Sequence, residues 1–155
     1  MNEEFRKICE QSETLGNISG EYLEYSEKEL GVSFPKEYRD FLLEFGALLG
    51  NGFEIYGLIP EENQDECPLW QNVVTVTKQM RSSKQAGTDN TNMIPISSDG
   101  METNYFINSG RSDTEIWAIT YEEKKLVASS LRRAFKILCQ AKYYSFITPS
   151  SLPSK

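Results

Sequence analysis

Histidine is absent from this 155-residue chain, and its absence excludes several kinds of chemistry. No Ser-His or Cys-His pair can activate a nucleophile, and the commonest metal ligand in proteins is missing. The three cysteines are widely separated at Cys9, Cys67 and Cys139 with no C-x-x-C pair, which argues against a zinc site and a disulfide framework. The stretch from Gly46 to Gly52 lacks the lysine of a phosphate-binding loop. We therefore expect no catalytic residues, no metal and no cofactor.

Long hydrophobic runs are missing as well. No window approaches the ~18 uninterrupted apolar residues of a membrane span, and the N-terminal segment MNEEFRKICEQ is charged, unlike the apolar core of a secretory signal. We expect the protein to contact no membrane and to stay in the cytoplasm with its thiols reduced. Its length fits one domain, which we place at residues 1–147, and the aperiodic segment 148–155 is predicted to be a flexible tail.

Basic residues are scarce in the first half of the chain. Residues 1–66 hold 16 Asp and Glu against 5 Lys and Arg, a balance of −11, whereas residues 67–155 hold 7 against 11, a balance of +4. An acidic half disfavours nucleic acid, whose phosphates it repels, and attracts a cationic protein partner. A solubilising surface explains the same composition, since asymmetry along the chain need not persist in space.

The stretch ELGVSFPKEYRDFLLEFG at residues 29–46 predicts a helix end, a turn and a second helix. Gly31 suits the left-handed position that ends a helix, and Pro35 suits the first turn of the next one. The second helix carries one apolar stripe, formed by Tyr38, Phe41, Leu42 and Phe45. Further helices are predicted over residues 2–14 and 20–30 and from residue 131, the last with Leu131, Phe135 and Leu138 in the core.

Alternating apolar residues predict strands near 53–58, 93–97, 103–108, 115–121 and 124–128. Segment 70–82 is ambiguous, because its β-branched residues favour a strand locally. The order of elements predicts an α+β fold with N-terminal helices, a central antiparallel-rich mixed sheet and a C-terminal helix. Aromatic residues at 143–146 cover the sheet end or, if exposed, mark a dimer contact, so we expect a monomer or a weak dimer.

Four blocks of sequence, taken in order, resemble the SUKH superfamily, which contains cell-wall-synthesis regulators of the Smi/Knr type and bacterial immunity proteins that neutralise toxins. The blocks are ELGVSFPKEYRDFLLEFG at 29–46, GFEIYGL at 52–58, MIPISSDGMETNYFIN at 93–108 and ASSLRRAFKIL at 128–138. The chain departs from the usual pattern at residues 47–51, where ALLGN replaces an immediate second glycine. The resemblance favours a helix over 70–82 that packs on the sheet.

The resemblance implies a non-catalytic protein-binding domain, most simply an immunity protein that binds and neutralises a cognate toxin such as a cationic nuclease. A regulatory adaptor of the Smi/Knr type is the alternative. The leading candidates for partner binding are the carboxylates of the loop between Pro60 and Pro68 and the tryptophan beside it, namely Glu61, Glu62, Asp65, Glu66 and Trp70. Further candidates lie in the second and third blocks: Glu54, Tyr56, Asp99 and Glu102.

Each candidate also has a plainer structural interpretation. The run EENQDE is typical of a solvated loop, and paired carboxylates of this kind also occur in acid/base catalysis. Asp99 and Gly100 are typical of a tight turn. Trp70 either anchors the acidic loop to the body or serves as a hot spot in an interface. Trp117 lies in an alternating apolar strand and is expected in the core.

Overall fold

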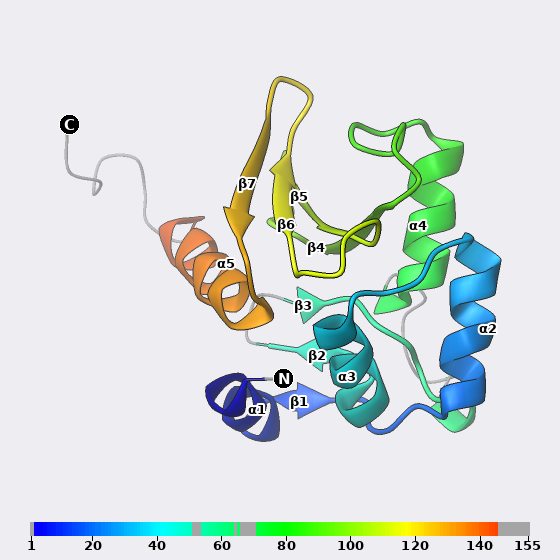
Figure 1. Cartoon of the computed structure of the whole chain (residues 1–155). Coiled ribbons are helices and arrows are strands. Elements are labelled where there is room, and N and C mark those ends of the chain that lie inside the picture. Colours follow the sequence, from blue (N-terminus) through cyan, green and yellow to red (C-terminus); the bar gives the residue numbers. More distant parts are fainter. Residues whose placement is uncertain (1, 51–53, 64, 66–70, 146–155) are drawn as a thin grey trace.

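The computed structural model describes residues 2–50, 54–63, 65 and 71–145, and its helices and strands are shown in Figure 1. The first half contains α1 (Glu3–Glu10), β1 (Glu13–Thr14), α2 (Gly20–Leu30), α3 (Lys36–Phe45), β2 (Leu48–Leu49), β3 (Glu54–Ile55) and the short 3₁₀ helix η1 (Glu61–Asn63). The second half contains α4 (Val73–Ser82), β4 (Met93–Ser98), β5 (Asn104–Asn108), β6 (Ile116–Ile119), β7 (Lys124–Ala128) and α5 (Leu131–Ser145). The predicted α+β class is confirmed.

The strands form two antiparallel sheets. The small sheet has the order β1-β2-β3, and the large one is a meander with the order β4-β5-β6-β7. The two sheets are joined where β3 passes β4, because the Tyr56 N–H donates to the Ile96 carbonyl at 2.7 Å and the Ser97 hydroxyl donates to the Glu54 carbonyl at 2.5 Å. Within the described residues, parallel pairing is limited to one bridge between Gly57 and Asn72.

Local propensity and observed structure differ at the N-terminus and after α3. The helix predicted over 2–14 ends at Glu10, and Glu13 and Thr14 pair with β2 instead. The first predicted strand was near 53–58, yet Leu48 and Leu49 already form a strand, the central one of the small sheet. Both differences arise from pairing with distant residues, which outweighs local preference in such short segments.

Segment 73–82 is helical, as the family resemblance predicted. The Asn72 side chain caps α4 by accepting hydrogen bonds from the N–H groups of Val74 and Thr75 at 2.9 and 3.2 Å. Val73, Thr77 and Met80 then face the interior at helical spacing. A good cap and a buried face therefore overcome the strand preference of the β-branched residues.

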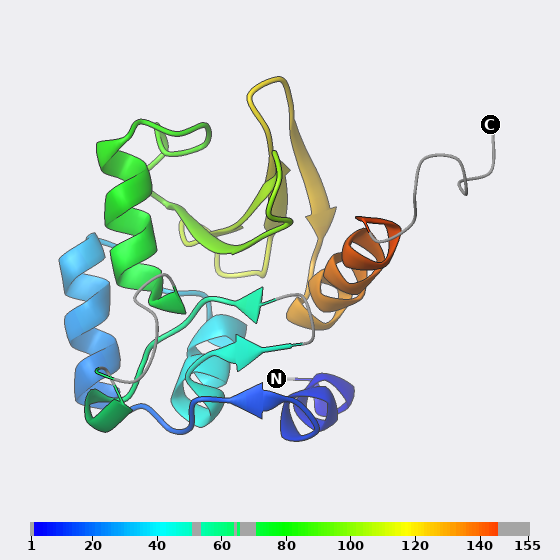
Figure 2. The same cartoon turned by 180° about the vertical axis from the view of Figure 1, so that it is seen from behind.

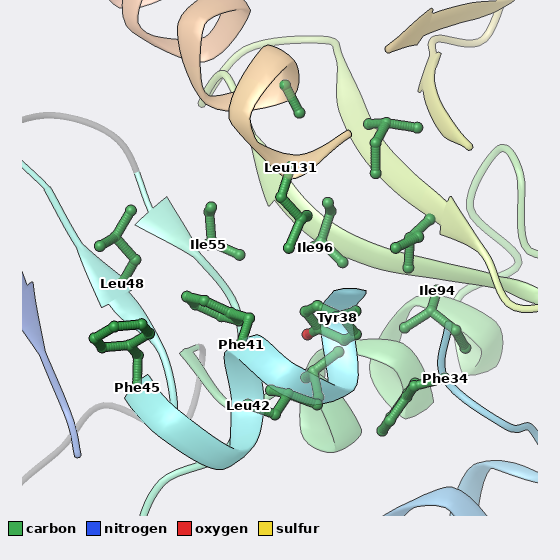
Figure 3. Packing of buried hydrophobic residues seen from close by; sticks show 14 of the residues in the cluster. Phe34, Tyr38, Phe41, Leu42, Phe45, Leu48, Ile55, Ile94, Ile96 and Leu131 are labelled. Atoms are coloured by element: carbon green, nitrogen blue, oxygen red, sulfur yellow. The ribbon is translucent and has the colours of Figure 1, made fainter. Parts of the chain in front are cut away.

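The core is built around α3, which lies against the small sheet on one side and reaches the large sheet and α5 on the other (Figures 1, 2 and 3). All four predicted stripe residues of α3 are buried, as are Leu131 and Leu138. The ring of Phe41 lies between those of Phe5, Tyr38 and Phe45, with centroids 6.1, 6.1 and 6.3 Å away. Phe135 is only partly buried, packing edge-on against Phe5 at the margin of this cluster.

Two polar groups of α3 fix its neighbours. The fully buried Tyr38 hydroxyl donates to the backbone carbonyl of Tyr56 at 2.6 Å, and burial raises the pKa of Tyr38 so that the hydroxyl stays a donor. The Glu37 carboxylate accepts a hydrogen bond from the Leu131 N–H at 2.5 Å, which satisfies a free donor at the start of α5. Helix α3 thus holds both the segment after β3 and the start of the last helix.

Two glycines allow the chain to pass over itself beside α3. Gly46 ends the helix at φ +72°, and the Leu58 N–H donates to its carbonyl at 3.0 Å. A Cβ atom added to Gly57 would stand 1.7 Å from the Gly46 oxygen, closer than any side chain can tolerate. Gly46 and Gly57 are therefore in direct backbone contact, and the Gly46 carbonyl leaves no room for a side chain at position 57.

We expect Phe41→Ala to lower the free energy of unfolding by about 3–5 kcal/mol, because it empties the centre of the aromatic cluster. Urea unfolding followed by circular dichroism measures the change. The matched control is Tyr121→Ala, since Tyr121 is 85% exposed and its removal should cost less than ~0.5 kcal/mol. Equal effects of the two substitutions would contradict the packing described here.

We expect Gly57→Ala to lower the free energy of unfolding by more than ~3 kcal/mol, because the new methyl group overlaps backbone that cannot move aside. Gly20→Ala is the control, because a Cβ atom added there, in the first turn of α2, meets no other atom within 4 Å. It should leave the free energy of unfolding unchanged or raise it by up to ~1 kcal/mol. A stable, fully folded Gly57→Ala variant would show that the two glycines are not in contact.

Candidate protein-binding surface

The described part of the acidic loop is a short 3₁₀ turn, which lies beside the first half of α2. The Asn63 N–H donates to the Pro60 carbonyl at 2.9 Å, and Pro60 itself is buried. Glu61, Glu62 and Asp65 are exposed, as a partner-binding role requires. Glu66 and Trp70 lie outside the described residues.

Between η1 and α2 the surface is hollowed into a cleft of about 570 Å³. The two elements lie beside one another in both Figure 1 and Figure 2. One wall comes from α2 and the residues before it, and the other from η1: Asn17, Ile18, Ser19, Glu21, Tyr22 and Tyr25 face Pro60, Glu61 and Glu62. A second cleft of about 260 Å³ shares Tyr22 and Tyr25 and continues along α2 towards the start of α4.

The sequence of α2 explains which side chains reach this cleft. The Ser19 hydroxyl caps the helix by accepting the Tyr22 N–H at 3.2 Å, and Gly31 ends it at φ +71°. The buried stripe of α2 contains Leu23, Ser26, Glu27 and Leu30. That stripe directs Tyr25 outward, where 59% of it is exposed, and leaves Tyr22 partly buried beside it.

Many carboxylates of the acidic half are neutralised within the fold. Ion pairs join Glu27 to Arg39 at 3.2 Å, Glu29 to Lys78 at 3.0 Å, Asp40 to Lys36 at 2.9 Å and Glu4 to Arg132 at 2.6 Å, and Arg6 pairs with Glu44. Glu21, Glu61 and Glu62 make no ion pair with any residue that the structure describes. Uncompensated negative charge therefore remains on both walls of the cleft.

Tyr25 lies beside a polar contact that joins α2 to α4, the ion pair between Glu29 and Lys78 at 3.0 Å. Its hydroxyl shares a hydrogen bond with Glu29, which first through that bond and then through its charge raises the pKa of Tyr25. The Lys78 ammonium is the main cause that lowers the pKa of Glu29, followed by the bond from Tyr25. The ring of Tyr25 remains on the surface.

The other candidates form a separate group along β3, β4 and the β4–β5 turn. Tyr56 is partly buried, and burial followed by the charge of Glu54 raises its pKa to about 12. The Asp99 carboxylate accepts hydrogen bonds from the N–H groups of Met101 and Thr103 at 2.8 and 3.1 Å, so it builds the turn. Glu102 is exposed on that turn. The cleft beside η1 is lined by none of these four residues.

Sequence reasoning missed Glu21, Tyr22 and Tyr25, which the structure places opposite the predicted Glu61 and Glu62. The available signal was the periodicity of α2, because Leu23, Ser26 and Leu30 at helical spacing leave the tyrosines at the edge of the buried face. Nothing in the sequence showed that η1 would pack beside them.

Trp117, which was expected in the core, is only partly buried, and the Lys124 ammonium lies 4.8 Å from its ring centre.

The groups that support catalysis or metal binding are sparse in the part of the chain that is described. There, no cluster of three or more His, Cys, Asp or Glu side chains is placed to hold a metal ion. Burial, aided by the charge of Glu44, raises the pKa of the Cys9 thiol to about 12, and burial also raises the pKa of Cys139. Both thiols stay protonated near neutral pH and are poor nucleophiles. None of the helices described is long and apolar enough to cross a bilayer.

The structure is a small α+β domain whose exposed carboxylates and tyrosine line an open surface cleft. A family model described as SMI1-KNR4 cell-wall matches residues 1–133, and the chain therefore belongs to the SUKH superfamily. Domains of this superfamily generally interact with other proteins. A comparison with curated proteins finds no match.

If the protein needs no metal, a chelator should not affect it. We expect EDTA, at roughly 1 mM and on the order of a hundredfold excess over protein, to leave the melting temperature unchanged. Removing a metal lowers the melting temperature only when that metal binds the native state. Differential scanning fluorimetry with and without the chelator measures this. A lowered melting temperature that excess Mg²⁺, Ca²⁺ or Zn²⁺ restores would reveal a carboxylate metal site.

Proposed function

We propose that this chain is a non-catalytic immunity protein that binds and neutralises a cationic protein toxin in the cytoplasm, as a monomer or a weak dimer. The observation that carries the proposal is the acidic cleft between α2 and η1, where exposed Tyr25 lies near Glu21, Glu61 and Glu62, none of which forms an ion pair with a residue that the structure describes. Membership of the SUKH superfamily supports a protein partner. The missing histidine and the protonated cysteines support binding in place of catalysis.

On such a surface, charge affects mainly the association rate and direct contact mainly the dissociation rate. Unpaired carboxylates attract a cationic partner over distances of about a Debye length, ~8–10 Å at physiological salt, and so raise the association rate. Once the surfaces meet, aromatic side chains that become fully desolvated slow dissociation. A rigid scaffold is sufficient for both effects, because neither requires a chemical step.

A second candidate is a regulatory adaptor that binds components of cell-wall synthesis or its signalling in the same cell. The description of the matching family, SMI1-KNR4 cell-wall, favours it. An adaptor uses the same kind of surface, so the two candidates differ in the partner and in the consequence of losing it.

Co-expression separates the two candidates. The protein encoded immediately upstream is expressed from an inducible promoter with and without this chain, and growth is measured. Toxicity that this chain relieves, with a complex recovered by gel filtration, supports the immunity role. A harmless neighbour, together with wall defects when this chain is deleted, overturns that role in favour of the adaptor.

We expect the triple variant Glu61→Gln, Glu62→Gln, Asp65→Asn to slow association with the toxin domain and to flatten the salt dependence of its rate, with a smaller change in dissociation. Surface plasmon resonance at two salt concentrations measures both rates. The control triple, Glu10→Gln, Glu13→Gln, Glu24→Gln, removes equal charge from other exposed sites. Equal slowing by both triples would mean that net charge alone, and not this loop, steers the partner.

A further inference from the structure

The cleft between α2 and η1 combines two features that one cationic side chain uses together. Exposed aromatic surface is present at Tyr25, and carboxylates stand on both walls at Glu21, Glu61 and Glu62. A guanidinium group is planar, so it stacks on an aromatic ring while its N–H groups form paired hydrogen bonds with carboxylates in the plane. An ammonium group is a compact point charge, so it neither stacks face to face on a ring nor forms the paired hydrogen bonds of a planar fork.

We propose that this cleft binds an arginine side chain presented by the protein partner, with the guanidinium on Tyr25 and its N–H groups directed to Glu21, Glu61 and Glu62. This inference rests on the proposed protein-binding function and adds the chemical class that the cleft selects. The volume of about 570 Å³ lies in the ~300–1,000 Å³ range of side-chain and small-ligand sites. It accommodates the arginine together with the partner residues beside it.

The walls of the cleft are fixed before the partner arrives. On one side, the Ile18 N–H donates to the Leu43 carbonyl at 3.2 Å, which ties the segment before α2 to α3. On the other side, the bond between Asn63 and Pro60 shapes η1. Within α2, the Ser19 hydroxyl fixes the first turn by accepting the Tyr22 N–H at 3.2 Å. Less side-chain freedom is lost on binding when the site is already ordered.

Neighbouring charges distinguish this cleft from the rest of the acidic surface. Glu29 also lies beside Tyr25 and lines the second cleft, but it is already paired with Lys78 of α4 at 3.0 Å. Glu27 is likewise occupied by Arg39. Among the described residues that line this cleft, a guanidinium entering from solvent therefore meets open carboxylates at Glu21, Glu61 and Glu62, which sets the direction from which the partner approaches.

Short blocked peptides test the selection without knowledge of the partner. The probes are acetyl-(Gly-Arg)₃-amide and acetyl-(Gly-Lys)₃-amide, which carry equal charge, titrated into ¹⁵N-labelled protein. We expect the arginine peptide to bind roughly tenfold more tightly, about 1.4 kcal/mol, with amide shifts concentrated at Glu21, Tyr22, Tyr25 and Glu62. Tyr25→Leu should remove the preference for arginine and leave weak binding of both peptides.

A matched pair of triple variants separates the site from the general field. Glu21→Gln, Glu61→Gln, Glu62→Gln should weaken the arginine peptide by roughly tenfold or more, whereas Glu10→Gln, Glu13→Gln, Glu24→Gln should weaken it less than about threefold. Equal affinity for the two peptides, or equal weakening by the two triples, overturns the arginine site. Protection in co-expression together with either of those results would retain the immunity role and refute only this cleft.

Discussion

The Tyr38 hydroxyl lies in the core, where no water reaches it, and it donates to the backbone carbonyl of Tyr56. An unpaired hydroxyl there would cost about 1–3 kcal/mol, so this bond fixes α3 against the segment that follows β3. Gly57 comes next and touches Gly46, and the chain is then directed to η1 beside α2. The position of the acidic cleft is therefore a consequence of how α3 packs, several residues away from any group that a partner would contact.

The two halves of the sequence carry opposite charge, and part of that charge is neutralised by ion pairs between them. Glu4 on α1 meets Arg132 on α5, and Glu29 on α2 meets Lys78 on α4. Exposed ion pairs of this kind contribute little stability, about 0–1 kcal/mol each, but they remove charge from the surface. The carboxylates that remain open decide where the field is strongest, and those of the cleft lie next to exposed aromatic surface. Composition alone could not show which carboxylates are paired within the fold and which remain open at its surface.

The sequence predicted the elements whose signals are local. The spacing of Tyr38, Phe41 and Phe45 with a proline before and a glycine after defined α3, and turn chemistry identified Asp99. The two-residue strands β1 and β2 were missed because their pairing depends on residues more than thirty positions apart. For the same reason Glu61 and Glu62 could be predicted as exposed carboxylates, but their tyrosine neighbours on α2 could not.

The contact between Glu37 and the start of α5 joins residues 94 positions apart in sequence. Leu131 and Leu138 enter the same core as Phe5 and Phe41, so the first and last helices complete one structure. Such non-local closure delays folding until the distant partners are available. On the ribosome, the early helices must wait for α5 to emerge before the core can close. A newly made molecule therefore acquires its binding surface in final form only after the chain has been synthesised through α5.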